Sequence, residues 1–474
     1  MKIQATTLDA YNLLHEGCLA LSQVEANGIR IDEKYLQQAI TDTKAKIRAM
    51  SDELTSDKIY KVWKKRFGLK MNVDSGDQLG KILFGEMGYK CPSLTSSGKP
   101  KTDISVLESL DIDFVKKLLQ IKKLKKAVGT YLKGIQKETC NGFLHPVFNL
   151  HLVETFRSSS DSPNFQNQPV SNPEMAKLIR TCFIPREDRH IIEVDFSGAE
   201  IHGAAWYHKD PVMQTYLNDK TKDMHRDLAQ QCYMLSDKEM SPIEGDKTDA
   251  KRIKNIRYCG KNKFVFPQFY GDWFMNCAPS LWAAIDQMKL QTRDGLSLKE
   301  HLKKKGITQL GVIDPKSRPS PGTFVNHIKE VEFDFWNNRF AKYKEWKDKW
   351  WEKYQRTGQF TTLTGFVISG LYKRNEVINY PIQGVAFHCL LWSLIRLQKQ
   401  LRKYKMKSLI VGQIHDSIVA DVCKDEVKDY LTMVKQIMTE DIKKHWTWIN
   451  TPLEVEAEMS PLNRSWYEKT KVEM

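Results

Sequence analysis

Two aspartates stand out from the other carboxylates because each follows a run of residues typical of a buried strand. Asp195 ends the run HIIEVD, and small residues and a helical pattern follow it. Asp416 lies between two β-rich runs in SLIVGQIHDSIVADV, which predicts a hairpin with His415 and Asp416 at its tip. Taken singly, Asp195 reads equally well as a helix N-cap, and Asp416 as an ordinary turn residue. Together, two strand-borne aspartates could share a pair of magnesium ions, which prefer one or two carboxylates plus substrate phosphates. Two such ions clamp both oxygens of an in-line phosphoryl transfer.

The stretch RYCGKNKFVFPQFYG (257–271) could supply the cations that a triphosphate needs. Arg257 and Lys261 are four residues apart and lie on what reads as one face of a helix. Pro267 interrupts this helix, because it lacks an N–H and would clash with the carbonyl of Lys263 in a regular helical turn. The sequence therefore predicts a basic, aromatic helix with a local irregularity.

The composition narrows the class of protein around these residues. The chain has 474 residues, a formal net charge of +15, 41% hydrophobic residues and 12 tryptophans. A folded protein with this charge is expected to bind a polyanion, either nucleic acid or an anionic membrane. No apolar run approaches the ~20 residues of a membrane span, and the N-terminus lacks the apolar core of a signal peptide. Nine cysteines without a CxxC pair favour free thiols in a reducing cytoplasm and argue against zinc. Nucleic acid is therefore the favoured partner, and no membrane is expected.

The run FVKKLLQIKKLKKAVGTYLKGI (114–135) predicts a long amphipathic helix. Apolar residues recur at steps of three and four, and lysines cover most of the remaining surface. The ordinary interpretation is a solvated helix face. Beside the total charge, a sequence-independent contact with a phosphate backbone is the alternative. The residues proposed for that contact are Lys122, Lys123, Lys125 and Lys126.

Several segments together resemble family A DNA polymerases of the DNA polymerase I type. DFSGAE (195–200), RYCGKNKFVFPQFYG (257–271) and QIHDS (413–417) are similar to motifs A, B and C of that family. Further likenesses, in family order and over nearly the whole chain, are QVEANGIRID (23–32), TFRSSSDSPNFQNQP (155–169), KDMHRDLA (222–229), NYPIQG (379–384) and PLEVEAEMSPLNRSW (452–466). The resemblance covers the polymerase region only, and the sequence of the matching segments is more similar to phage members of the family than to bacterial ones.

The resemblance implies a mixed α+β, right-hand polymerase fold with an antiparallel sheet in the palm and a mostly helical thumb and fingers. The N-terminal segment and thumb are expected in residues 1–150, and the palm in 151–215 and 370–474. The fingers are expected in 216–369, with an unassigned insert near 278–322. The implied function is DNA-directed extension of a primer 3′ end with dNTPs and two Mg²⁺ ions. The alternatives are a single-subunit RNA polymerase and a non-catalytic nucleic-acid-binding relative.

The resemblance also implies a role for individual residues. Asp195, Asp416 and the carbonyl of Phe196 are expected to hold the metal ions. His225, Arg257 and Lys261 are expected to bind the triphosphate, with Lys261 as proton donor to pyrophosphate. Glu200 is expected to exclude a ribose 2′-hydroxyl, Phe266 to govern the acceptance of dideoxynucleotides, and Tyr270 to stack near the templating base. The residues expected to follow primer–template DNA are Arg157, Asn379, Gln383 and His415.

One spacing departs from the family and explains the proline. The family's Lys and Tyr of motif B are eight residues apart, whereas Lys261 and Tyr270 are nine apart. In a straight helix this would place the two on opposite faces. A widened π-helical turn near residues 263–267 would absorb the extra residue, and Pro267 fits there because a bulge already breaks one hydrogen bond.

Other departures limit what the family implies. Ser417 stands where many relatives have Glu, so a third carboxylate is lost there. Gly198 stands where relatives commonly have Gln, so only the backbone N–H of Gly198 could contact phosphate. Asn375 stands where the family often has Arg, and the neighbouring Arg374 is a candidate substitute. Only 22 residues precede QVEANGIRID, so no proofreading exonuclease is expected in this chain. We expect a cytoplasmic monomer (in the host cytoplasm if viral), with a separate exonuclease or processivity protein as a candidate partner.

Overall fold

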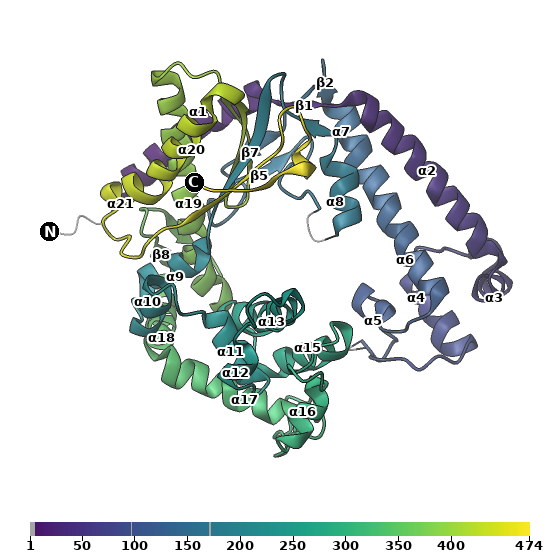
Figure 1. Cartoon of the computed structure of the whole chain (residues 1–474). Helices are drawn as coiled ribbons and strands as arrows, with labels where there is room; N and C mark the ends of the chain where they lie inside the picture. The colour runs from purple at the N-terminus through teal and green to yellow at the C-terminus, as the bar shows by residue number, and fades with distance from the viewer. Residues whose placement is uncertain (1–4, 96, 170–171) are drawn as a thin grey trace.

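Three groups of elements form an open, C-shaped arrangement in the computed structural model, which describes residues 5–95, 97–169 and 172–474. A central sheet lies at the top of the view in Figure 1, a helical arm (residues 33–138) descends on one side, and a helical lobe (residues 211–357) lies below. Each group has its own cluster of buried apolar side chains.

The central sheet is antiparallel, with the strand order β10-β11-β7-β12-β13. In the middle strand, Ile192, Val194 and Phe196 are buried, while Glu193 and Asp195 alternate with them on the opposite face. The strands are β7 (Arg189–Phe196), β10 (Leu409–Ile414), β11 (Ser417–Cys423), β12 (Val455–Met459) and β13 (Thr470–Val472).

Helices pack with the buried side of this sheet into the largest core. The 30-residue helix α19 (Arg374–Lys403) is buried over most of its length and contacts α1 and α9. Thr6 and Asp9 form a capping box that begins α1. The other helices of this group are α1 (Thr7–Asn27), α8 (Pro173–Arg180), α9 (Ala199–His208), α20 (Val427–Gln436) and α21 (Ile442–His445), with the π-helical turn η7 (Ile437–Asp441) and short 3₁₀ turns η6 (Lys424–Glu426) and η8 (Trp466–Glu468).

The helical arm is built on two long helices, α2 and α6, which contact each other along the arm (Figure 1). Its elements are α2 (Glu33–Ser56), α3 (Lys58–Phe67), η1 (Gly68–Lys70), α4 (Gly76–Gly80), η2 (Lys81–Glu86), α5 (Ile104–Glu108), α6 (Asp113–Lys126), η3 (Ala127–Leu132) and α7 (Lys133–Glu138). The helix predicted over 114–135 is confirmed, with a π-helical turn inside it.

The helical lobe carries the predicted basic helix, which is α13 followed by a π-helical turn, η4. Its elements are α10 (Pro211–Asn218), α11 (Met224–Cys232), α12 (Asp237–Met240), α13 (Lys247–Gly260), η4 (Lys261–Val265), α14 (Phe266–Phe269), α15 (Phe274–Gln287), α16 (Leu298–Lys304), α17 (Phe324–Asp334), η5 (Phe335–Arg339) and α18 (Ala341–Thr357).

Short strands connect the three groups. A four-stranded sheet has the order β2-β3-β1-β6, and two hairpin-like pairs join β4 to β5 and β8 to β9. The strands are β1 (Ile29–Ile31), β2 (Thr139–Cys140), β3 (Phe143–Leu144), β4 (Val147–Asn149), β5 (Ser159–Asp161), β6 (Phe183–Ile184), β8 (Gln359–Thr361) and β9 (Val367–Ser369). The predicted mixed α+β class with an antiparallel sheet is confirmed. Among the described residues, no helix is long and apolar enough to cross a membrane.

Candidate active site

The central sheet brings the two predicted aspartates to the same edge. Asp195 is the next-to-last residue of β7, and it pairs in register with Ser417 at the start of β11. Asp416 occupies the turn between β10 and β11, and its carbonyl accepts a hydrogen bond from the Phe196 N–H at 3.4 Å. The hairpin prediction is confirmed. The N-cap interpretation of Asp195 is wrong, because α9 begins after Gly198, whose φ of 67° lies in the left-handed region that favours glycine.

The charges at this edge favour a cation. Crowding by protein atoms raises the pKa of the Asp195 carboxyl to about 7, and repulsion from Asp416 and Glu193 adds to this rise. Burial also raises the pKa of Asp416, although Arg157 at 3.9 Å opposes the effect. Two carboxylates and the Phe196 carbonyl are the oxygen donors that Mg²⁺ prefers. No cluster of three or more His, Cys, Asp or Glu side chains suited to a metal occurs in the described part of the chain.

Glu200 links the sheet edge to the helical lobe. It lies in the first turn of α9 and accepts a hydrogen bond from the Tyr270 hydroxyl. The Arg157 guanidinium lies 3.6 Å from the other carboxylate oxygen of Glu200. Burial and the nearby Glu200 carboxylate raise the pKa of Tyr270 well above its usual value. A cavity of only about 20 Å³ remains between Glu200, Phe266 and Tyr270.

The predicted phosphate-binding residues gather where α11 packs against α13. The Arg257 guanidinium contacts the Asp223 carboxylate, which also caps the N-terminus of α11. Burial lowers the pKa of His225 to about 4, and the positive charges of Arg257 and Lys261 contribute to this shift. His225 is therefore neutral at pH 7. The Lys261 ammonium lies 5.2 Å from the centre of the Phe266 ring.

Gly260 allows the two helices to approach closely. A Cβ at this position would lie 2.6 Å from the Ala229 Cβ and 2.7 Å from the His225 carbonyl oxygen. Neither neighbour is the flexible end of a side chain, so a larger residue would push α13 away from α11. The glycine thus keeps Arg257 and Lys261 beside His225.

The irregular turn that the spacing of Lys261 and Tyr270 predicts is present. The π-helical turn covers Lys261–Val265, about two residues earlier than expected, and Pro267 follows it in α14. The prediction that the extra residue is absorbed is confirmed, because the Tyr270 hydroxyl reaches Glu200. Asn379 donates to the Tyr270 carbonyl at 3.2 Å and so ties α19 to the same turn.

A buried amide that the sequence analysis missed fixes the turn after Pro267. Gln268 is 1% exposed, and its amide donates to the Glu332 carboxylate. The Trp336 indole N–H donates to the Gln268 carbonyl oxygen at 2.7 Å. Its partners follow more than 60 residues later in α17 and η5, so no local pattern could have indicated the contact.

Glu193 is a second residue that the sequence analysis missed. The Ser417 hydroxyl donates to Glu193 at 3.1 Å, and the Trp466 indole N–H donates to its other carboxylate oxygen at 2.9 Å. Burial alone would raise the pKa of Glu193, but ion pairing with Lys469 holds it below its usual value. The Glu193 carboxylate therefore lies beside Ser417, but its charge is already neutralised by Lys469.

Of the remaining candidates, Asn375 contacts the turn after Tyr270 and Arg374 does not. The Asn375 amide donates to the Gly271 carbonyl at 3.3 Å, whereas Arg374 pairs with Asp348 on α18. Arg374 therefore does not take the place of an arginine at position 375. His415 lies in the β10–β11 turn with a φ of 48°, and Gln383 is half-buried on α19.

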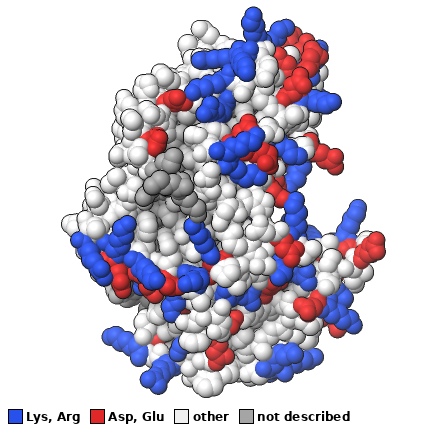
Figure 2. Space-filling model, turned by 90° about the vertical axis from the view of Figure 1, so that its left-hand side faces the viewer, with Lys and Arg blue, Asp and Glu red and all other residues white. Residues whose placement is uncertain are grey.

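The four arm lysines do not join this site. Lys123 pairs with Glu108 at 3.0 Å, and the Lys122 ammonium lies 3.5 Å from the Asp74 carbonyl. Lys125 and Lys126 are exposed. Elsewhere, basic and acidic side chains intermingle over the face shown in Figure 2, so the positive charge is not gathered into one patch on that face.

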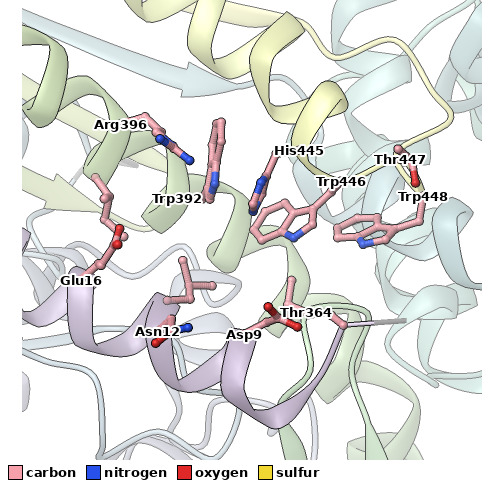
Figure 3. Close-up of a pocket in the computed structure, with 13 residues that line it drawn as sticks. Asp9, Asn12, Glu16, Thr364, Trp392, Arg396, His445, Trp446, Thr447 and Trp448 are labelled. Carbon is pink, nitrogen blue, oxygen red and sulfur yellow. The ribbon is translucent and has the colours of Figure 1, made fainter. Parts of the chain in front are cut away.

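A larger hollow, of about 510 Å³, lies on another part of the molecule. It is bounded by α1 on one side and by a row of rings, Trp392, His445, Trp446 and Trp448, on the other (Figure 3). The rings of Trp392 and His445 stack with their centres 5.1 Å apart. None of the predicted site residues lines it.

Comparisons with known proteins agree with the geometry. A sequence model described as DNA polymerase family A matches residues 34–260 and 331–468. DNA polymerase I of Lactococcus lactis subsp. cremoris is 26% identical over 456 residues, which are 94% of this chain and 44% of that protein. The thermostable DNA polymerase I of Thermus thermophilus is 24% identical over 92% of this chain and 46% of its own length, and the DNA polymerase of Bacillus phage SP01 is 24% identical over 90% and 47%. The chain thus spans about half the length of these relatives.

A solved structure shares the fold. The POL domain of Pol1 from M. smegmatis, in complex with DNA primer-template and dNTP, matches with a TM-score of 0.70 and 21% identity. The match covers 95% of this chain and 69% of that chain.

Proposed function

Because the chain belongs to DNA polymerase family A, we propose that it extends a primer 3′ end with deoxynucleoside triphosphates under the direction of a DNA template. The observation that carries the proposal is the meeting of Asp195 and Asp416 at one sheet edge, near Glu200, which contacts Tyr270 of the lobe. The fold shared with a polymerase domain supports it.

The proposed reaction is an in-line phosphoryl transfer. Asp195, Asp416 and the Phe196 carbonyl would hold two Mg²⁺ ions, which when bound would stabilise the charge on the attacking and leaving oxygens. The surplus of negative charge at the sheet edge supports this assignment. Arg257 and Lys261 would bind the triphosphate, with Lys261 as proton donor to the leaving pyrophosphate. His225 is neutral in the free protein and would donate a hydrogen bond rather than a charge.

The proposed sugar selection rests on Glu200. Its carboxylate borders a cavity of about 20 Å³ that also touches Phe266 and Tyr270, so a sugar placed there would leave little space for a 2′-hydroxyl. This disfavours the alternative of an RNA polymerase, which must admit that hydroxyl. The alternative of a non-catalytic relative is disfavoured because both aspartates and both triphosphate cations are present.

We assign the three groups of elements accordingly. The arm is the proposed thumb, the central sheet with α9 and α19 the proposed palm, and the lobe the proposed fingers. Arg157, Gln383, Asn379 and His415 would follow the primer–template DNA beside the palm, and the Gly198 N–H would meet phosphate. We further propose that the protein acts as a cytoplasmic monomer.

The test is primer extension by the purified chain. A labelled primer on a DNA template is incubated with dNTPs or with rNTPs, each with and without magnesium. We expect extension with dNTPs and magnesium only. Efficient extension with rNTPs would favour the RNA polymerase alternative, and tight DNA binding without any extension would favour the non-catalytic one.

A further inference from the structure

A strongly basic segment of the lobe has no part in the site described above. Residues 289–322 contain eight Lys and Arg against three Asp and Glu. The segment lies within the stretch between the two matched parts of the family model, 34–260 and 331–468. Its role therefore has to be inferred from its own residues.

The segment is a folded part of the lobe. Ser297 caps α16, and Leu298 and Leu302 of this helix are buried in the core of the lobe. The chain that follows is anchored at both ends, because the Thr308 N–H donates to the Gly322 carbonyl at 3.1 Å and the Phe324 N–H to the Gln309 carbonyl at 2.9 Å. The loop between these anchors is thus held against the end of α16, at the lower edge of the lobe in Figure 1.

The cations of this segment fall into two groups. The inner ones have acidic partners: Lys299 pairs with Asp286, and Arg293 lies 3.7 Å from Asp249. The other six are exposed, and none of them forms an ion pair with any residue that the structure describes. One of the six, Lys289, lies just after α15. We call the other five the outer basic surface: Lys303, Lys304, Lys305, Lys316 and Arg318.

The two parts of the outer basic surface share one end of the lobe. A Cβ on Gly322 would lie 3.3 Å from the Gly306 carbonyl oxygen, so the chain leaving Lys305 runs beside the end of the loop. Attraction to the negative end of the helix dipole accounts for lysines in the last turn of α16. It does not account for Lys316 and Arg318, which lie in the loop. Val312 and Ile313, which are 71% and 47% exposed, lie in the same loop.

We propose that the outer basic surface binds the phosphate backbone of the single-stranded template before it reaches the active site. Flexible lysines without acidic partners suit a contact that must accept any sequence. Exposed Val312 and Ile313 offer apolar contact to unstacked bases. The inference rests on the proposed function, in which Tyr270 of the same lobe stacks near the templating base, so uncopied template would approach the active site along this lobe.

The experiment compares two primer–template DNAs that differ only in the length of the single-stranded template overhang. The short overhang has one nucleotide, and the long one has about twenty, which is longer than a typical single-strand binding site. The variant is Lys303→Gln, Lys304→Gln and Lys305→Gln combined. The matched control removes the same charge from exposed residues at and just after the end of α19, by Lys403→Gln, Lys405→Gln and Lys407→Gln. Dissociation constants are measured over a range of salt concentrations, without nucleotides.

We expect the wild type and the control to bind the long overhang more tightly than the short one, and the variant to lose that difference. Three lost single-strand phosphate contacts should lower the salt slope on the long overhang by about two. An unchanged slope, an equal loss on both DNAs, or the same loss in the control would overturn the inference. Because binding is measured without catalysis, such a result would contradict only this inference. The proposed function would still be tested separately by primer extension.

Discussion

Replacing Glu200 with alanine should weaken the discrimination against ribonucleotides. The cavity beside Glu200 measures about 20 Å³, which is room for about one water molecule. A nucleotide sugar placed against Glu200 would already fill this space, so an added 2′-hydroxyl would have to displace side chains, and such overpacking costs about 1–3 kcal/mol. The ratio of kcat/KM for a dNTP to that for the matching rNTP should therefore fall about five- to 150-fold in Glu200→Ala.

Two further variants separate the size of Glu200 from its contacts. Glu200→Gln keeps the volume and removes the charge that faces Arg157 at 3.6 Å. Tyr270→Phe removes the hydrogen bond to Glu200 and leaves the carboxylate in place. We expect both to retain most of the discrimination. The assay is single-nucleotide incorporation with each sugar. A loss in Glu200→Gln as large as that in Glu200→Ala would refute the steric argument, and an unchanged ratio in Glu200→Ala would show that Glu200 is not the gate.

Three other predictions concern the thumb, the Gln268 contact and acid stability. Replacing Lys122, Lys123, Lys125 and Lys126 with Gln should weaken primer–template binding and lower its salt slope by about one for each lost contact; an unchanged slope would leave α6 with an ordinary solvated face. Gln268→Leu leaves Glu332 and Trp336 without their buried partner, at a cost of about 1–3 kcal/mol. Because Gln268 fixes the turn before Tyr270, we expect a raised KM for dNTPs with unchanged DNA affinity, and equal KM values would remove this positioning role. Burial lowers the pKa of His388 to about 3, so below its unfolded pKa of about 6.5 the unfolded state binds one more proton and stability falls with falling pH. Between pH 6 and 5 the wild type should lose about 1 kcal/mol more than His388→Asn in chemical denaturation, and equal losses would contradict the shift.

The sequence was sufficient to place the residues whose position depends on local patterns. Asp195 and Asp416 each end or adjoin a run of β-forming residues, so their place at strand ends follows from the alternation of apolar side chains. The π-helical turn follows from a count of residues between Lys261 and Tyr270, and it lies only about two residues from its expected position. The helix over 114–135 follows from its apolar period.

Contacts between distant segments could not be predicted in this way. Gln268 meets Glu332 and Trp336 only because α14 packs against α17 and η5. Glu193 is held by Lys469, which directly precedes β13, the last strand of the sheet. Neither pairing leaves a local pattern in the sequence, because a buried polar residue is recognised only once its partner is in place.

Two expectations about charge also depended on tertiary structure. Arg374 was a candidate substitute for an arginine at position 375, but it faces Asp348 on α18. The lysines of α6 were treated as one surface, but Lys123 is paired within the arm while Lys125 and Lys126 remain exposed. The direction in which a long side chain extends depends on which carboxylates the fold brings near, and spacing alone does not give this.

The most direct test of the proposed two-metal site is primer extension by Asp195→Asn and Asp416→Asn, with DNA affinity measured on the same preparations. Each substitution keeps the shape of the side chain and removes a negative charge from the sheet edge. Loss of an ion should cost several kcal/mol of transition-state stabilisation, so extension should fall on the order of a thousandfold or more. Primer–template affinity should stay close to that of the wild type, since the proposed backbone contacts come from other residues. Near-normal extension by either variant would contradict the assignment of Asp195 and Asp416 as the metal-binding pair.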